Sequence, residues 1–214
     1  MTATHDRALA NVAEHLRDDE IHVWRLDYRQ QFGRAPLHMV LGAYLGIDAA
    51  EVVLVDGEHG RPELAMGHQP ALGFNWSHSG GHALIALGRR VAPGIDLERK
   101  RPRARALEIA ERYFSADETA ALAALPASER SVAFLELWTA KEAVLKALGR
   151  GIAFGLDRLS IASAGDQLRL RRLEGDDVGA WQLRRLAIAP ELIAALAWRG
   201  DERRIRLGTL ASSD

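Results

Sequence analysis

The sequence predicts an α+β protein built from two similar lobes. Segments with the two-residue alternation of strands and segments with the 3.6-residue periodicity of helices follow one another as strand, helix, strands, then helices and strands again. With 214 residues and 48% hydrophobic composition, the chain is long enough to bury a sizeable core. We therefore expect an N-terminal α+β lobe at 1–91 and a C-terminal α+β lobe at 92–210.

The first lobe is expected to contain short strands around one helix. Ile21–Leu26 alternates like a half-buried strand, and Pro36–Gly46 carries apolar residues at helical spacing. Further strands are expected at Glu51–Val55, from Phe74 to a break at Gly80-Gly81, and at Ala83–Leu87.

The turn-forming segment Gly88–Pro93 predicts that Ile95–Glu98 returns antiparallel to Ala83–Leu87. In that register Glu98 would lie beside Ala83. We therefore expect the acidic strand to share one end of a sheet with the polar segment Asn75–Ser79.

The second lobe begins with helices. One is expected to end near Phe114, and the next to begin at Ser115, where Glu118 three residues later completes a capping box. The longest is expected over Ser128–Leu148, ended by glycines. Strands are expected at Leu168–Leu173, Trp181–Ile188 and Leu192–Trp198, and fraying at Ala211–Asp214.

Composition restricts the classes of function. Lys and Arg number 28 against 29 Asp and Glu, a net charge of -1, so the overall charge recruits neither nucleic acid nor an anionic membrane. The chain has no cysteine, which excludes disulfides and thiolate chemistry. Met1–Glu20 lacks the apolar core of a signal peptide, and no apolar run is long enough to span a bilayer. We expect a cytoplasmic protein, monomeric, without a nucleic-acid or membrane partner.

Two acidic residues alternate within Gly94–Glu98. The strand period of two places Asp96 and Glu98 on one face, roughly 6–7 Å apart along the strand, where both can approach one cation. Oxygen ligands without His or Cys favour magnesium or manganese over zinc. The alternative is that both carboxylates form the solvated face of an edge strand.

The long helix adds a third carboxylate and a lysine. Its apolar arc includes Glu142, and a carboxylate on a buried face requires a cation. Lys146 lies one turn beyond Glu142 and can reach the same anion or pair with Glu142 itself. The alternative is a surface pair of these two residues, with Lys141 snorkelling out of the apolar arc.

Ser77 and His78 stand just before Gly80-Gly81. A hydrolase with Ser as nucleophile and His as base is rejected, because adjacent strand residues point to opposite faces and no G-x-S-x-G elbow is present. Hydroxyls, an imidazole and glycine amides suit phosphate oxygens better. The alternative is a strand-end turn capped by Ser.

Together these segments resemble a known family. In order and spacing they are similar to the motifs of the surfactin-synthetase-activating type of 4'-phosphopantetheinyl transferase, strongly between Gly60 and Gly151 and more loosely in the flanks. The motifs that carry the resemblance are Phe74–Gly80, Gly94–Glu98, Phe114–Glu118 and Trp138–Lys146, with Gly60-Arg61-Pro62 before them.

The resemblance implies two α+β lobes related by a pseudo-twofold axis and a magnesium-dependent reaction. The 4'-phosphopantetheine group of coenzyme A, the co-substrate, would pass to a serine of an acyl or peptidyl carrier protein, releasing adenosine 3',5'-bisphosphate. Asp96, Glu98 and Glu142 would hold the metal, and His78 and Lys146 would contact coenzyme A phosphates. Arg61 would touch the nucleotide, with Ser77 beside His78 in the binding segment.

Glu142 and Lys146 are the candidate catalytic residues. Lys146 can neutralise charge on the pyrophosphate, while Glu142 is the candidate for positioning or deprotonating the attacking serine, directly or through water. Because Glu142 cannot be a tight ligand and a free base at once, the ligand role ranks first.

The N-terminal stretch departs from the family pattern. Only Asp27–Ala35 joins the first strand to the first helix, where the family has a longer basic segment, and His38 falls where an arginine is usual. These cations normally help to bind the 3'-phosphate. One alternative is therefore a degenerate member that binds a carrier protein or nucleotide without transfer. Another is an unrelated metal-dependent phosphohydrolase, which would be expected to show more His or Asp ligands.

Overall fold

The computed structural model describes residues 9, 12–68, 71–164 and 167–210. The expected fraying at 211–214 lies outside these residues.

The chain forms two compact units, Met1–Pro93 with Glu202–Asp214, and Gly94–Asp201. Each unit combines helices with strands, as the α+β prediction requires. Glu202 and the residues that follow it belong to the first unit, whereas the expected second lobe extended to residue 210.

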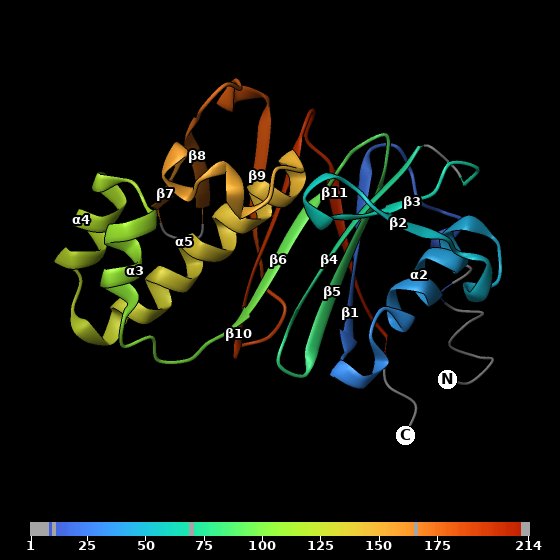
Figure 1. Cartoon of the computed structure of the whole chain (residues 1–214), viewed down its shortest axis with the longest axis horizontal. Coiled ribbons are helices and arrows are strands. Elements are labelled where there is room, and N and C mark those ends of the chain that lie inside the picture. Colours follow the sequence, from blue (N-terminus) through green and yellow to red (C-terminus); the bar gives the residue numbers. More distant parts are fainter. Residues whose placement is uncertain (1–8, 10–11, 69–70, 165–166, 211–214) are drawn as a thin grey trace. The chain divides into compact units, whose positions relative to one another are not determined.

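The first unit is built on a sheet of order β11-β1-β5-β4. β4 and β5 form an antiparallel hairpin, β5 is antiparallel to β1, and β1 is parallel to β11 (Figure 1). The elements of this unit are β1 (Glu20–Asp27), α2 (Ala35–Leu45), β2 (Leu54–Asp56), β3 (Pro62–Leu64), β4 (Leu72–Ser79), β5 (His82–Arg89) and β11 (Arg204–Leu210).

Helix α2 supplies the apolar surface that covers one face of this sheet. Pro36 lies in its first turn, where the missing N–H has no helical partner, and Gly46 ends it in the left-handed conformation at φ 69°. Val40 and Leu41 are fully buried in the same cluster as Ile85 of β5. The sequence prediction of this helix, and of the strand before it, is confirmed.

The second unit places its longest helix on a sheet of order β6-β10-β9. β10 pairs antiparallel with both β6 and β9, and α5 packs against β6 and β10 (Figure 1). The elements of this unit are β6 (Gly94–Arg99), α3 (Ala106–Tyr113), α4 (Ala116–Ala124), α5 (Ala127–Leu148), β7 (Leu159–Ala164), β8 (Gln167–Leu173), β9 (Trp181–Leu186) and β10 (Leu192–Arg199).

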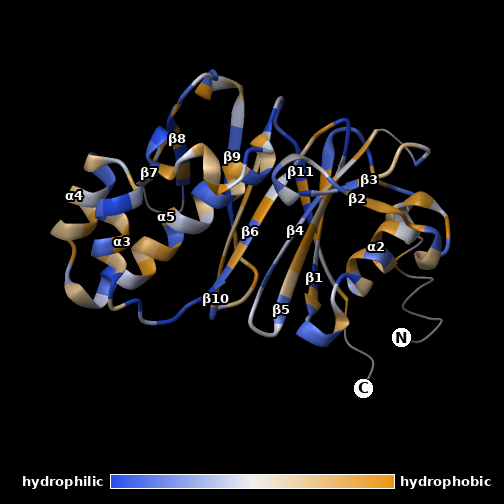
Figure 2. Cartoon of the chain, in the orientation of Figure 1, coloured by the Kyte–Doolittle hydropathy of each residue, from blue (hydrophilic) through white to orange (hydrophobic). Residues whose placement is uncertain are grey.

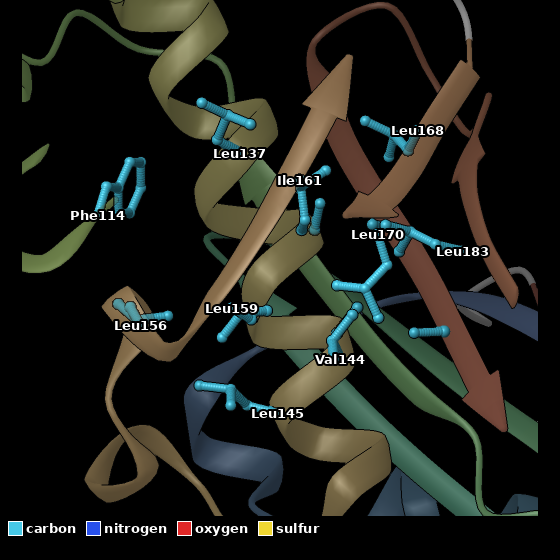
Figure 3. Packing of buried hydrophobic residues seen from close by; sticks show 14 of the residues in the cluster. Phe114, Leu137, Val144, Leu145, Leu156, Leu159, Ile161, Leu168, Leu170 and Leu183 are labelled. Atoms are coloured by element: carbon cyan, nitrogen blue, oxygen red, sulfur yellow. The ribbon is translucent and has the colours of Figure 1, made fainter. Parts of the chain in front are cut away.

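The core of the second unit surrounds α5. Figure 3 shows Val144 of α5 among Leu159 of the β7 strand and Leu170 of the β8 strand, and all three side chains are buried. The Ser115–Glu118 capping box begins α4 as predicted, and α5 ends at Gly149, which has φ 75°. Figure 2 shows the contrast between this apolar core and the hydrophilic segment that joins β6 to α3.

The predicted pairing of Ile95–Glu98 with Ala83–Leu87 is wrong. Both edges of β5 are already occupied, one by β1 and the other by β4, so β5 has no edge left for β6. β6 pairs instead with β10. The acidic strand therefore does not share a sheet with Asn75–Ser79.

None of the helices among the described residues is both long enough and apolar enough to cross a bilayer.

Candidate metal and phosphate site

The acidic strand β6 directs its two carboxylates towards α5. Asp96 lies opposite Ala195 in the β6–β10 ladder, and Glu98 lies opposite Ile193. Cross-strand partners project from the same face of a sheet, and Ala195 and Ile193 belong to the core around α5. Both carboxylates therefore lie on the helix-covered face, and they are not the solvated face of an edge strand.

Gly94 allows the helix to approach this strand closely. A Cβ atom built on Gly94 would lie 2.0 Å from the carbonyl oxygen of Ala143 and 2.2 Å from the amide nitrogen of Ala147, which are backbone atoms of α5. Only glycine accommodates such an approach. The contact fixes the turn of α5 that contains Glu142 and Lys146 beside the start of β6.

Cations of the chain hold both strand carboxylates. Lys146 Nζ lies 2.8 Å from Asp96 Oδ1 and donates to the carbonyl oxygen of Ile95 at 3.2 Å. Glu98 lies 3.6 Å from Arg103 and 3.9 Å from Arg101, measured between nitrogen and carboxylate oxygen. The alternative of a Glu142–Lys146 surface pair does not describe this arrangement, because Lys146 pairs with Asp96.

Glu142 is the carboxylate without such a partner. Its Oε1 is buried and has no hydrogen-bond partner among the described residues. Burial raises the pKa of Glu142 to about 7, and the nearby charges of Asp96 and Glu98 add to this rise while Lys146 opposes it. Because ionisation of Glu142 is costly in this position, an added cation would stabilise its carboxylate more than those of Asp96 and Glu98, which already have cationic partners.

The donor set fits a hard divalent cation. Three carboxylates of β6 and α5 influence one another electrostatically, and a buried oxygen of Glu142 lacks a hydrogen-bond partner. Oxygen donors of this kind suit magnesium or manganese. Within the described part of the chain, however, no three Asp, Glu, His or Cys side chains form a ready metal cluster. Asp96 and Glu98 are instead drawn towards Lys146 and the arginines.

The raised pKa of Glu142 predicts a pH dependence of stability in the metal-free protein. Between an unfolded pKa of 4.5 and a folded pKa of about 7, the native state holds a proton that the unfolded chain has lost. Stability therefore falls as pH rises through this window, by about 3 kcal/mol. Glu142→Gln should remove most of this loss, as measured by urea denaturation in EDTA at pH 5 and pH 8.

Glu108→Gln is the matched control, because Glu108 lies on the exposed surface of α3 and pairs with Arg105. This variant should retain the pH dependence of the wild-type protein. Equal losses of stability between pH 5 and pH 8 in Glu142→Gln and wild type would contradict the burial of an ionisable Glu142.

Lys141 does not snorkel, contrary to the alternative reading of the helix. Its side chain is 0% exposed, and Nζ lies 2.8 Å from Glu118 Oε2. It also donates to the carbonyl oxygens of Leu156 at 2.8 Å and Leu159 at 2.7 Å. Burial lowers the pKa of Lys141 and the Glu118 charge opposes this shift. The sequence marked Glu118 as a helix cap but gave no sign of this second partner.

Glu118 connects three elements through its carboxylate. Oε2 accepts from the backbone N–H of Ser115 at 3.0 Å and from its hydroxyl at 2.6 Å, while Oε1 accepts from the N–H of Ile161 at 2.9 Å. With Lys141, it ties α4 and β7 to α5. This buried node fixes the position of Lys141, the neighbour of Glu142 on α5.

The other predicted site residues belong to the first unit. Arg61 is part-buried, donates to the carbonyl oxygens of Phe74 at 2.9 Å and Pro93 at 3.4 Å, and has its pKa lowered by burial. Ser77 is buried and lies opposite Leu84, whereas His78 is exposed and lies opposite Ala83. The two side chains thus project from opposite faces of β4, which agrees with rejecting a Ser–His nucleophile pair.

Comparisons with known proteins identify relatives of this chain. The profile of the "4'-phosphopantetheinyl transferase superfamily" matches residues 92–197, which include β6 and α5. The chain is 31% identical over 219 residues to "4'-phosphopantetheinyl transferase HetI" of Nostoc sp., covering 86% of this chain and 90% of that protein.

Two further relatives match over a smaller part of their length. "Putative 4'-phosphopantetheinyl transferase slr0495" of Synechocystis sp. is 36% identical, over 59% of this chain and 51% of that protein. "4'-phosphopantetheinyl transferase Sfp" of Bacillus subtilis is 31% identical, over 63% of this chain and 58% of that protein. The aligned region thus spans just over half the length of these two relatives.

The fold is an α+β fold in which Asp96 and Glu98 lie on the helix-covered face of β6. The extent of the match to HetI settles the family: the chain belongs to the 4'-phosphopantetheinyl transferase superfamily.

Proposed function

We propose that this protein transfers the 4'-phosphopantetheine group of coenzyme A to a serine of an acyl or peptidyl carrier protein, with magnesium, and releases adenosine 3',5'-bisphosphate. Relatives named as 4'-phosphopantetheinyl transferases support the reaction class. The observation that carries the proposal is that Asp96 and Glu98 lie on the face of β6 that α5 covers, and that both raise the pKa of Glu142 on α5.

Asp96, Glu98 and Glu142 would hold the magnesium, or manganese in its place. A divalent cation bound there would neutralise the charge that develops on the pyrophosphate during displacement. Release of Asp96 from Lys146 would free the lysine Nζ for a phosphate oxygen, which is the partner that the family resemblance implies. The side chain of Lys146 is 26% exposed, and its partner in the absence of a metal is the Asp96 carboxylate.

Glu142 acts first as a metal ligand in this proposal. A contribution to positioning or deprotonating the carrier serine, directly or through water, ranks second. In the first unit, His78 and Arg61 are the candidates for binding phosphate and nucleotide, with Ser77 a neighbour in the same segment. The absence of cysteine from the chain agrees with a role in the reducing cytoplasm.

The test is to incubate the protein with coenzyme A, magnesium and an apo carrier protein, and then to weigh the carrier by mass spectrometry. We expect the carrier to gain the mass of one phosphopantetheine group. An unchanged carrier together with retained binding of coenzyme A or carrier would support the degenerate member. Hydrolysis of coenzyme A without transfer would support the phosphohydrolase, and either result would overturn the proposal.

The two residues of α5 should respond differently to substitution. Lys146→Ala should weaken coenzyme A binding and lower turnover, because it removes a phosphate partner. Glu142→Gln should chiefly lower the maximal rate and raise the magnesium concentration needed, because it weakens a metal ligand. Steady-state kinetics over a magnesium titration measure both effects. Identical magnesium titrations for wild type and Glu142→Gln would contradict this division of roles.

A further inference from the structure

The imidazole of His78 packs against two aromatic rings of the first unit, which also contact each other. Its centroid lies 4.5 Å from that of Tyr28, with the planes inclined by 27°, and 5.3 Å from that of Trp76. Tyr28 and Trp76 meet edge to face at 5.8 Å. Tyr28 is only 6% exposed, whereas His78 is exposed. A buried ring thus supports an exposed imidazole that is available to a ligand.

The register of the sheet explains why these rings meet. Leu26 of β1 lies opposite Ala83 of β5, and Ala83 lies opposite His78 of β4, so the three side chains share one face. Tyr28, two residues after Leu26, returns to that face, and its N–H donates to the carbonyl oxygen of Gly81 at 2.9 Å. The single methyl group of Ala83 leaves room for the Tyr28 ring to reach His78.

We propose that Tyr28 is a positioning residue for His78 in the recognition of the 3'-phosphate of coenzyme A, an inference that rests on the function proposed above. A charge-assisted hydrogen bond to phosphate is directional, so the imidazole must be held in one orientation when it binds. Stacking on Tyr28 restricts the rotation of the imidazole before binding, and less rotational entropy is then lost when the phosphate binds. Tyr28 itself touches no reacting atom.

The short connection between β1 and α2 makes this support important. The connection carries only two arginines, Arg29 and Arg34, and Arg34 pairs with Asp56 at 3.1 Å. With few cations in this connection, the orientation of His78 matters more for phosphate recognition. In this chain, the packing of Tyr28 against His78 would take the place of additional cations in phosphate recognition.

The experiment measures the preference for coenzyme A over 3'-dephospho-coenzyme A by competition titration, without a carrier protein. His78→Ala should remove most of this preference. Tyr28→Leu should reduce it by about fivefold or more, since one poorly aligned charge-assisted hydrogen bond has that effect on affinity. Tyr28→Phe, which keeps a flat ring, should stay within about twofold of wild type. Tyr28→Met takes the place of Tyr28→Leu if the latter does not fold.

Proton NMR of the His78 ring supplies a second readout that does not depend on ligand. Stacking on Tyr28 should shift the imidazole resonances upfield. Tyr28→Leu should remove the part of this shift that Tyr28 causes and leave the part that Trp76 causes, while Tyr28→Phe preserves the whole shift. A loss of general stability alone would not move these resonances selectively. The same shift in Tyr28→Leu and wild type would contradict the stacked arrangement.

Two outcomes of the titration overturn the inference in distinguishable ways. Wild-type preference in Tyr28→Leu, with loss of preference in His78→Ala, would show that His78 is oriented without Tyr28. Wild-type preference in His78→Ala would show that the 3'-phosphate is held elsewhere. Neither outcome bears on transfer, which the mass of the carrier protein reports independently.

Discussion

Asp96→Ala should abolish transfer and leave the fold intact. Asp96 supplies charge to the site. Its removal reduces the repulsion that raises the pKa of Glu142 but also breaks the ion pair with Lys146 at 2.8 Å, so the two effects on the stability of the metal-free protein oppose each other. We expect turnover to fall by a factor of about 100 or more, because the carboxylate would bind the metal that stabilises the transition state. Turnover of the apo carrier is measured together with thermal stability.

Asp96→Asn is the matched variant, because it preserves the size of the side chain and removes its charge. It should be as inactive as Asp96→Ala. An Asp96→Ala protein of normal thermal stability that keeps more than a tenth of wild-type turnover would contradict the metal assignment.

Among the variants proposed for this protein, Lys141→Met should produce the largest loss of unfolding free energy. It leaves the carboxylate of Glu118, which is 5% exposed, without its cation, and deprives two buried carbonyl groups of a donor. Breaking a buried ion pair from one side costs about 3–5 kcal/mol of unfolding free energy. Urea denaturation measures this loss directly.

The double variant Lys141→Met/Glu118→Gln should recover part of the loss, because no unpaired charge then remains. Arg105→Met is the control. Arg105 and Glu108 also lie 2.8 Å apart but are exposed, and breaking such a pair costs about 0–1 kcal/mol. A Lys141→Met protein no less stable than Arg105→Met would contradict the buried node.

Local patterns in the sequence predicted the elements of the site well. The alternation within Gly94–Glu98 placed Asp96 and Glu98 on one face, and their register with Ile193 and Ala195 confirms it. The capping box at Ser115 and the extent of α5 are also confirmed. These features depend on neighbours within a few residues, which is the range over which periodicity and capping act.

Pairings between distant segments could not be predicted in the same way. The Gly88–Pro93 turn indicated a hairpin, but β1 and β4 occupy both edges of β5, and β6 pairs with β10, which begins at Leu192. β11 joins the first unit through a parallel pairing with β1. Such pairings depend on which edges the rest of the chain leaves open.

The sequence could not predict Glu118 as the buried partner of Lys141, for a related reason. Helical periodicity placed this lysine on the apolar arc, where snorkelling is the usual outcome for a long side chain. The structure instead supplies Glu118 from α4 and the carbonyl groups of Leu156, just before β7, and of Leu159, its first residue. A partner from another element is a tertiary property. The apolar arc of the helix shows only that the charge of Lys141 needs a partner.

Manganese binding tests the central claim that Asp96, Glu98 and Glu142 form one cation site. Electron paramagnetic resonance of free manganese gives the dissociation constant in the presence of coenzyme A, without carrier protein or turnover. We expect one site in the wild-type protein and a loss of affinity of about tenfold or more in Asp96→Asn, Glu98→Gln and Glu142→Gln, with Glu108→Gln unchanged. Wild-type affinity in the three site variants would contradict the claim.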